Sequence, residues 1–196
     1  MKLLSILKEI QLTGKRSHKE RQERYKIALE KKIKQYIKDG GQGDLNLEGA
    51  PITFIPSGLE VGGNLNLSKT KITSLPDGLK VDGNLNLSDT KITLLPLDLK
   101  VGGSLNLANS SIKSLPDGLE VGGHLNLTVS RITSLPRGLK VGGLSLWGRP
   151  ITSLPSDLQV GDSLDLKDTP IEKNYTEKEI RKMLRGYKGV IYMYKP

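Results

Sequence analysis

The sequence predicts an α/β solenoid, a chain wound into stacked coils that share one hydrophobic interior. Three observations predict it: a 20-residue repeat, an apolar pattern common to the repeats, and helical patterns confined to the two ends. A unit this short cannot bury its own apolar side, so neighbouring copies must stack to be stable. A flatter parallel β-solenoid is the alternative architecture.

Each repeat is marked by two leucines separated by one residue. These pairs are Leu45/Leu47, Leu65/Leu67, Leu85/Leu87, Leu105/Leu107, Leu125/Leu127, Leu144/Leu146 and Leu164/Leu166. The step between pairs is 20 residues, except for one step of 19 before Leu144. Because an apolar and a polar residue alternate here, as in a half-buried strand, the stacked pairs predict a parallel sheet.

The rest of each repeat supplies further inward positions. An apolar residue recurs five positions after the second leucine, at Ile52, Ile72, Ile92, Ile112, Ile132, Ile151 and Ile171. Segments such as Leu79-Lys80-Val81, followed in most repeats by a glycine, predict a short strand on the back of each coil. At the corner between these elements, buried hydroxyls are expected to bond backbone groups, at Thr70, Thr90, Ser110, Ser130 and Thr169.

The outward positions are more uniform than the binding face of a diversified repeat protein. Asparagine stands between the paired leucines at Asn46, Asn66, Asn86, Asn106 and Asn126. We expect these amides to hydrogen bond along the stack. This part of the sheet therefore argues against a broad binding surface.

The pattern LxLxxTxIxxLPxxL resembles the short, proline-containing leucine-rich repeats of bacterial proteins, whose units read LxLxxNxLxxLPxxL. The resemblance covers residues 44–171, about seven coils and about two-thirds of the chain. It implies a leucine-rich repeat solenoid, but it implies no particular activity, because one fold hosts many functions. The sequence departs from the pattern where threonine or serine mostly replaces the asparagine.

The N-terminal 43 residues predict a basic helical cap. Residues 3–10 carry one helical apolar stripe, and residues 25–37 carry a second one that ends at a glycine pair. Ser17 and Glu20 form a capping-box pattern before the second stripe. Repeat arrays need terminal units that cover the open end of the core, so we expect this cap to lie over the first coil.

Residues 172–196 predict a C-terminal cap of one helix and one strand. Thr176 and Glu179 form another capping-box pattern, and residues 180–184 place apolar side chains on one helical face. Alternation over residues 190–194 predicts a final strand. Its tyrosines would close the sheet edge or stack on nucleic-acid bases.

The net charge of +9 is concentrated in the two ends. Residues 1–43 hold 12 Lys/Arg against 5 Asp/Glu, residues 44–171 hold 11 against 13, and residues 172–196 hold 7 against 3. One alternative function is therefore nucleic-acid binding through the basic caps, in which seven cations would contact phosphates: Lys15, Arg16, Arg21, Arg24, Lys31, Lys32 and Lys34. Glutamates interleaved with these cations also fit a solvated helix face.

Several functional classes are disfavoured by composition. The chain has no cysteine, which removes disulfides and thiol nucleophiles and fits a cytoplasmic location. Its start lacks the apolar core of a signal peptide, and no segment reaches membrane-spanning length. The two histidines, His18 and His124, show no triad arrangement in sequence. We therefore expect no enzyme, no cofactor, no metal site, no small-molecule substrate and no membrane association.

One coil breaks the internal regularity. The unit at Leu144 is a residue short, and it alone carries Trp147 and Arg149, where other units have small, polar or hydroxyl residues. Trp and Arg dominate binding hot spots, and local rules tend to be broken where function requires it. The predicted protein-binding residues, which lie on this coil and its neighbours, are Trp147, Arg149, Arg131, His124 and Lys167. Packing of Trp147 against the C-terminal cap is the structural alternative.

These observations predict a non-enzymatic protein–protein interaction module whose partner the sequence does not identify. The compact size, the lysine-rich ends and the style of the repeats also resemble small proteins encoded by bacteriophages and by gut or aquatic bacteria. That resemblance implies an inhibitor of a host defence protein, or a virion accessory protein.

Overall fold

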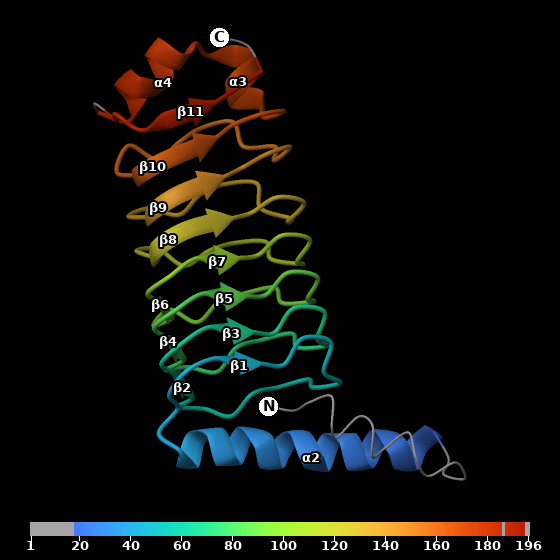
Figure 1. Ribbon diagram of the computed structural model, residues 1–196. Coiled ribbons are helices and arrows are strands. Elements are labelled where there is room, and N and C mark those ends of the chain that lie inside the picture. The colour runs from blue at the N-terminus through green and yellow to red at the C-terminus, as the bar shows by residue number, and fades with distance from the viewer. Residues whose placement is uncertain (1–17, 186, 195–196) are drawn as a thin grey trace. The chain divides into compact units, whose positions relative to one another are not determined.

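The structure is a computed structural model that describes residues 18–185 and 187–194 (Figure 1). The chain divides into two compact units, Met1–Gly40 and Gly41–Pro196. The first predicted helical stripe, at residues 3–10, and the capping residue Ser17 lie outside the described residues.

The first unit contains helix α2, His18–Lys38. Leu29 and Ile33, four residues apart on one helical face, are both buried. The helix ends where Gly40 donates its backbone N–H to the carbonyl of Ile37 at 3.1 Å, with the left-handed φ of 81° that glycine accepts without strain. The predicted helix and its glycine stop are therefore confirmed, while its role as a cap over the first coil stays a prediction.

The second unit is a solenoid built on two rows of parallel strands (Figure 1). The front row contains β1 Leu45–Asn46, β3 Leu65–Asn66, β5 Leu85–Asn86, β7 Leu105–Asn106, β8 Glu120–Asn126, β9 Lys140–Ser145, β10 Gln159–Asp165 and β11 Val190–Tyr192. The back row contains β2 Glu60–Val61, β4 Lys80–Val81 and β6 Lys100–Val101, and it continues into the first residues of β8, β9 and β10. The strand predicted on the back of the coils is thus confirmed.

The strand register explains why the repeat length is so constant. In the front row Leu65 pairs with Leu85, and in the back row Val81 pairs with Val101, each 20 residues further along the chain. Equivalent side chains therefore stack in rows that point into the same interior. A change of one residue within a paired segment would turn that row toward solvent, so the single 19-residue step must be absorbed in a bend between the paired segments of the back and front rows.

The interior consists of these aliphatic rows. The first leucine of each pair is fully buried along most of the front row, at Leu65, Leu85, Leu105, Leu125, Leu144 and Leu164. Each such side chain contributes about 1.5–3 kcal/mol on burial. The rows are less complete at Ile52, Leu135 and Leu154, which are half-buried.

The corner hydroxyls bond backbone groups, as predicted: four of the five donate to carbonyls, and Ser130 accepts the N–H of Ile132 at 3.5 Å. Thr70 donates to the carbonyl of Leu67 at 2.7 Å, and Ser110 donates to that of Leu107 at 2.6 Å. The residue before each hydroxyl adopts a left-handed backbone conformation, with φ between 54° and 58° at Lys69, Asp89, Asn109, Val129 and Asp168. The equivalent positions in two other coils are glycines, Gly49 and Gly148.

The asparagine row bonds differently from the expectation. The side-chain oxygen of Asn66 accepts the backbone N–H of Ser68 at 3.1 Å, and that of Asn126 accepts the N–H of Thr128 at 3.0 Å. These bonds close turns within one coil instead of running along the stack, because an asparagine side chain readily reaches the N–H two residues on.

A different polar ladder runs along the stack, just before the front strands. The side-chain oxygen of Asp44 accepts the backbone N–H of Asn64 at 2.7 Å, and Asn64 and Asn84 accept the next two N–H groups in turn. Ser104 then accepts the N–H of His124 at 2.9 Å. The repeat pattern did not indicate this ladder, since the acceptor changes along the stack from aspartate to asparagine and then to serine.

The C-terminal end contains two helices, α3 Pro170–Asn174 and α4 Glu177–Met183, and strand β11 beside β10 (Figure 1). The capping box of α4 is confirmed, because Thr176 and Glu179 exchange both hydrogen bonds. Helix α3 was not predicted, although Thr169 caps it and Pro170 starts it, a recognisable pattern. The expected boundary between solenoid and cap therefore falls inside α3.

Candidate protein-binding site

The missing residue of the short coil lies in the bend inside β9. Val121 pairs with Val141, whereas His124 pairs with Gly143, so three steps along β8 match two steps along β9. The pairing of Leu125 with Leu144 then restores the register of the interior. The irregularity therefore changes the outer surface and leaves the core rows intact.

The imidazole of His124 lies over the glycine of the short coil. A Cβ atom on Gly143 would come within 2.6 Å of His124 Cδ2 and 2.9 Å of the Ser163 hydroxyl. Partial burial lowers the pKa of His124, and the carboxylate of Asp165 opposes that shift in part. The ring is therefore neutral near pH 7, where it acts as a hydrogen-bonding group and not as a cation.

The indole of Trp147 is held by a hydrogen bond from its ring nitrogen, and much of the side chain is exposed to solvent. Its Nε1 donates to the carboxylate of Asp168 at 2.8 Å, and the backbone N–H of Asp168 donates to Glu172 of α3 at 2.7 Å. The side chain nevertheless remains 47% exposed. The link to the C-terminal cap therefore orients the ring without burying it.

The two arginines of the predicted site differ in their surroundings. Arg149, at the corner where most coils have a hydroxyl, donates to the carbonyls of Trp147 and Ser130 and is half-buried. Burial lowers the pKa of its guanidinium group. Arg131 is exposed. Arg149 thus ties the short coil to the preceding one, and Arg131 presents its charge to solvent.

Val129 belongs to this surface but was not among the predicted site residues. It is 57% exposed and has a φ of 57°, which is strained for a β-branched side chain. Other coils place glycine, asparagine, aspartate or lysine at this position. Strain that burial does not offset tends to persist at functional positions, and comparison of this position between repeats would have identified it.

Two tyrosines extend the surface to the last strand. The ammonium group of Lys167 lies 5.2 Å from the ring centre of Tyr192 and 5.8 Å from that of Tyr194. Such cation–π contacts fix the position of the lysine. Tyr192 pairs with Asp165, so it continues the outward row of the sheet at its C-terminal edge. Both rings remain substantially exposed.

These residues form what we call the C-terminal face. It comprises the five predicted residues together with three found from the structure, namely His124, Arg131, Trp147, Arg149, Lys167, Val129, Tyr192 and Tyr194. The predicted five lie on three successive coils, which backbone bonds join, as from Gly148 N–H to the Lys167 carbonyl at 2.9 Å.

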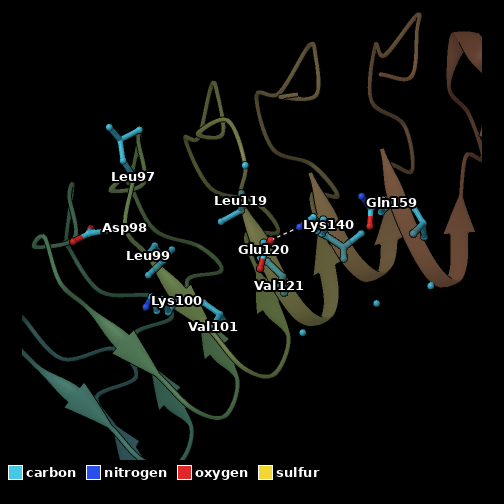
Figure 2. Close-up of a pocket in the computed structure, with 16 residues that line it drawn as sticks. Leu97, Asp98, Leu99, Lys100, Val101, Leu119, Glu120, Val121, Lys140 and Gln159 are labelled. Atoms are coloured by element: carbon cyan, nitrogen blue, oxygen red, sulfur yellow. Dashed lines mark hydrogen bonds and ion pairs between the residues drawn. The ribbon is translucent and has the colours of Figure 1, made fainter. Parts of the chain in front are cut away.

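A groove of about 950 Å³ runs along the back row (Figure 2). It is lined by residues 97–101, 118–122, 140–142 and 159–161. Lys140 and Glu120 within it form an ion pair at 2.6 Å, and the hydrogen bond from Lys140 lowers the pKa of Glu120. The groove is a weaker candidate for protein recognition than the C-terminal face. Two of its charges are paired with each other, and none of its described lining residues is aromatic.

The cations predicted for nucleic-acid binding are only partly described. Lys15 and Arg16 lie outside the described residues, and Arg21 lies within α2. Arg24, Lys31 and Lys34 are exposed, whereas Lys32 is half-buried and has a pKa lowered by that burial. The exposed cations recur along one helix, which is the arrangement that the prediction requires.

Within residues 18–185 and 187–194, no three histidine, cysteine or acidic side chains are grouped so that they could hold a metal ion. In the same part of the chain, no helix has both the length and the apolar character needed to cross a membrane.

Comparisons with known proteins identify the fold. No protein-family model and no curated protein matches the chain. Among solved structures, the leucine-rich repeat domain of a Shigella effector matches with a TM-score of 0.53 and 20% sequence identity, covering 82% of this chain and 85% of that one. At this level of identity the likeness establishes the fold alone. That fold is a leucine-rich repeat solenoid, whose C-terminal end carries two short helices.

Proposed function

We propose that this leucine-rich repeat solenoid is a non-enzymatic module that binds a protein partner through its C-terminal face. The observation that carries the proposal is the distribution of exposed apolar side chains. Nine large ones are exposed among the described residues of the solenoid unit, and four of them belong to the C-terminal face: Val129, Trp147, Tyr192 and Tyr194. Clustered exposed apolar side chains are typical of interaction surfaces.

The chemistry of this face also favours a protein partner. Trp147 and Arg131 belong to the residue types that dominate interface hot spots. Trp147 is held by Asp168, and Lys167 is held over two tyrosine rings, so these side chains lose little conformational freedom on binding. Neutral His124 and Ser163, which both lie over Gly143, supply further polar groups on the same three coils.

The other half of the front row offers less for specific recognition. Its outward positions repeat asparagine, and the oxygen of each asparagine amide accepts an N–H of its own coil. A partner would meet nearly the same surface at every coil and would have no preferred register. We therefore place the binding energy at the C-terminal end.

The predicted source, biological role and location of the protein are part of the same proposal. The style of the repeats supports a bacteriophage protein that inhibits a host defence protein or serves as a virion accessory, acting in the cytoplasm. Identification of the partner tests all of these statements together.

An affinity pulldown from the native host tests the proposed site. We expect Trp147→Ala to weaken partner capture by at least about 30-fold, which corresponds to 2 kcal/mol for a hot-spot residue. Phe54→Ala is the matched control, because Phe54 is an exposed aromatic residue distant in sequence from this face. Equal retention of the partner by both variants would contradict the proposal.

Nucleic-acid binding by the basic ends predicts a different result. Phosphate contacts weaken steeply with added salt, and charge reversal at Lys31, Lys32 and Lys34 would remove them. Under that function Trp147→Ala would have little effect on binding of an oligonucleotide. A protein partner on the C-terminal face predicts the opposite sensitivity.

A further inference from the structure

The solenoid carries a row of cations that its fold does not use. Lys71, Lys91 and Arg131 occupy the same position in three coils, and Lys113 lies two residues further along in the coil between the last two. All four side chains are exposed. None of them takes part in an ion pair among the described residues of the solenoid. We call this row the cationic edge.

Backbone bonds tie two of these positions to the preceding coil. The N–H of Lys71 donates to the Ile52 carbonyl, and the N–H of Arg131 donates to the Ile112 carbonyl, both at 3.1 Å. Successive coils are about 4.8 Å apart, as neighbouring strands are. Like charges at directly opposed positions repel and destabilise the pairing. The stack of Lys71 on Lys91 therefore opposes folding.

Several charges elsewhere on the solenoid have structural partners. Lys69 pairs with Glu48 at 2.7 Å. On the loops that lead to the back row, Asp98 accepts the N–H of Gly78 at 2.8 Å, and Asp157 accepts that of Gly138 at 3.0 Å. Against this background, a row of unpaired and mutually repelling cations indicates a charged ligand.

The neighbouring side chains fit an anionic ligand with carboxylates. Threonines Thr73, Thr93 and Thr133 stand two residues after the three equivalent cations, and all are exposed. Their hydroxyls add hydrogen-bond donors beside the charges. The acidic neighbour Asp89 is already engaged, because its carboxylate accepts the amide of Asn109 at 2.6 Å.

We infer that the cationic edge binds an acidic, extended segment of the protein partner that docks on the C-terminal face. The inference rests on the proposed function, and Arg131 belongs to both surfaces. Three coil steps span about 14 Å, the length of about four extended residues. A nucleic acid fits less well, because residues 71–131 contain no phenylalanine, tyrosine or tryptophan on which bases would stack.

Fluorescence anisotropy with a labelled octaglutamate peptide and the full chain tests the inference. We expect Lys71→Glu/Lys91→Glu to weaken binding at least about tenfold, because two attractive charges become repulsive. The matched control is Lys80→Glu/Lys100→Glu, which makes the same change on successive coils of the back row. A second control, Lys31→Glu/Lys34→Glu, reports the contribution of α2. We expect either control to change binding less than about threefold.

A labelled single-stranded oligonucleotide without a partner protein provides the competing probe. Binding of the oligonucleotide that depends on Lys71 and Lys91, with no binding of octaglutamate, would overturn the inference. Equal losses in the edge variant and in both controls would also overturn it, because the attraction would then be one of net charge. Unchanged urea midpoints confirm that each variant is folded.

The proposed function and this inference fail in distinguishable ways. Trp147→Ala lies outside the cationic edge, so it should leave octaglutamate binding unchanged while it weakens partner capture. Loss of octaglutamate binding in Lys71→Glu/Lys91→Glu, with normal partner capture by Trp147→Ala, would support the edge and contradict the C-terminal face. Normal octaglutamate binding by Lys71→Glu/Lys91→Glu would contradict the edge, whatever the result for Trp147→Ala.

Discussion

The two halves of the front row share one interior and present different surfaces. Leu65 in the N-terminal half and Leu164 in the C-terminal half are both fully buried, at the same place in the coil. The outward residue that follows is Asn66 in the first case and Asp165 in the second, beside Tyr192. The inward rows thus determine the fold, while the outward rows are free to acquire function.

The strands also differ between the halves. β1, β3, β5 and β7 contain two residues each, whereas β8, β9 and β10 contain seven, six and seven. The longer strands run from the back row into the front row through the bend. The C-terminal face therefore stands on a more continuous sheet, and rigid elements position binding residues better than loops do.

The largest expected effect tests whether the interiors of the two halves are equivalent. Leu85→Ala and Leu164→Ala each remove a fully buried side chain, so each should lower the free energy of unfolding by about 2–5 kcal/mol. Urea denaturation measures both values. A loss below about 1 kcal/mol at Leu164 would show that the C-terminal coils are not part of the same core.

A substitution at the strained position 129 should change the stability of the protein and its binding of the partner in opposite directions. Asparagine tolerates the left-handed conformation better than valine does, so Val129→Asn should raise the free energy of unfolding by about 1 kcal/mol. The same change should weaken capture of the partner, because it removes an exposed apolar side chain. Asn109→Val, at the equivalent position of the preceding coil, is the reciprocal control and should destabilise without affecting capture.

The polar ladder should contribute a smaller amount in the N-terminal half. Asn84→Ala removes the acceptor of the Ser104 N–H, which it bonds at 2.7 Å, and should lower the free energy of unfolding by about 0.5–1.5 kcal/mol. Hydrogen exchange of the Ser104 amide provides the local measurement. An exchange rate equal to that of the wild type would exclude this bond as a stabilising contact.

The smallest expected effect is a pH dependence of stability caused by His124, whose backbone N–H is the last donor of the polar ladder. Its folded-state pKa is lower than the unfolded value of about 6.5, so protonation favours the unfolded chain. Stability should therefore fall as the pH drops from 7.5 to 5.5, by on the order of 0.5 kcal/mol for a partly exposed ring. His124→Asn should remove this decrease, measured by urea denaturation at both pH values.

The control for this pH dependence is the other histidine. The two carboxylates with lowered pKa values, Glu120 and Glu179, titrate below this window. His18→Asn should leave the dependence intact. If it removes the dependence and His124→Asn does not, burial of the His124 imidazole is not the cause.

The interior could be predicted from the sequence because it depends on spacing alone. Rows that recur every 20 residues must share one register, and this requirement placed the leucine pairs and the Leu79–Val81 back strand correctly. The Thr176 capping box was predictable for a similar reason, since it is a local exchange of two hydrogen bonds.

The outer surface depends on contacts that spacing does not encode. The position of the His124 ring follows from a missing residue in the next coil, and the Asp168 bond of Trp147 crosses 21 residues. The strain at Val129 requires the backbone angle, although its place among glycine and asparagine in other repeats was an available signal. The charge count did not indicate the cationic edge, because the solenoid as a whole has a slightly negative net charge.

Site-specific photo-crosslinking in the native host tests the central claim most directly. A photoreactive amino acid at position 145 or at position 86 occupies the same outward row, and Ser145 and Asn86 are both half-buried. Position 145 lies on the same coil as Trp147 of the C-terminal face, whereas position 86 lies on a coil that contributes no residue to that face. We predict a specific protein crosslink from position 145 and none from position 86. A crosslink of the same partner from position 86 alone, or equally from both positions, would contradict the assignment of binding to the C-terminal face.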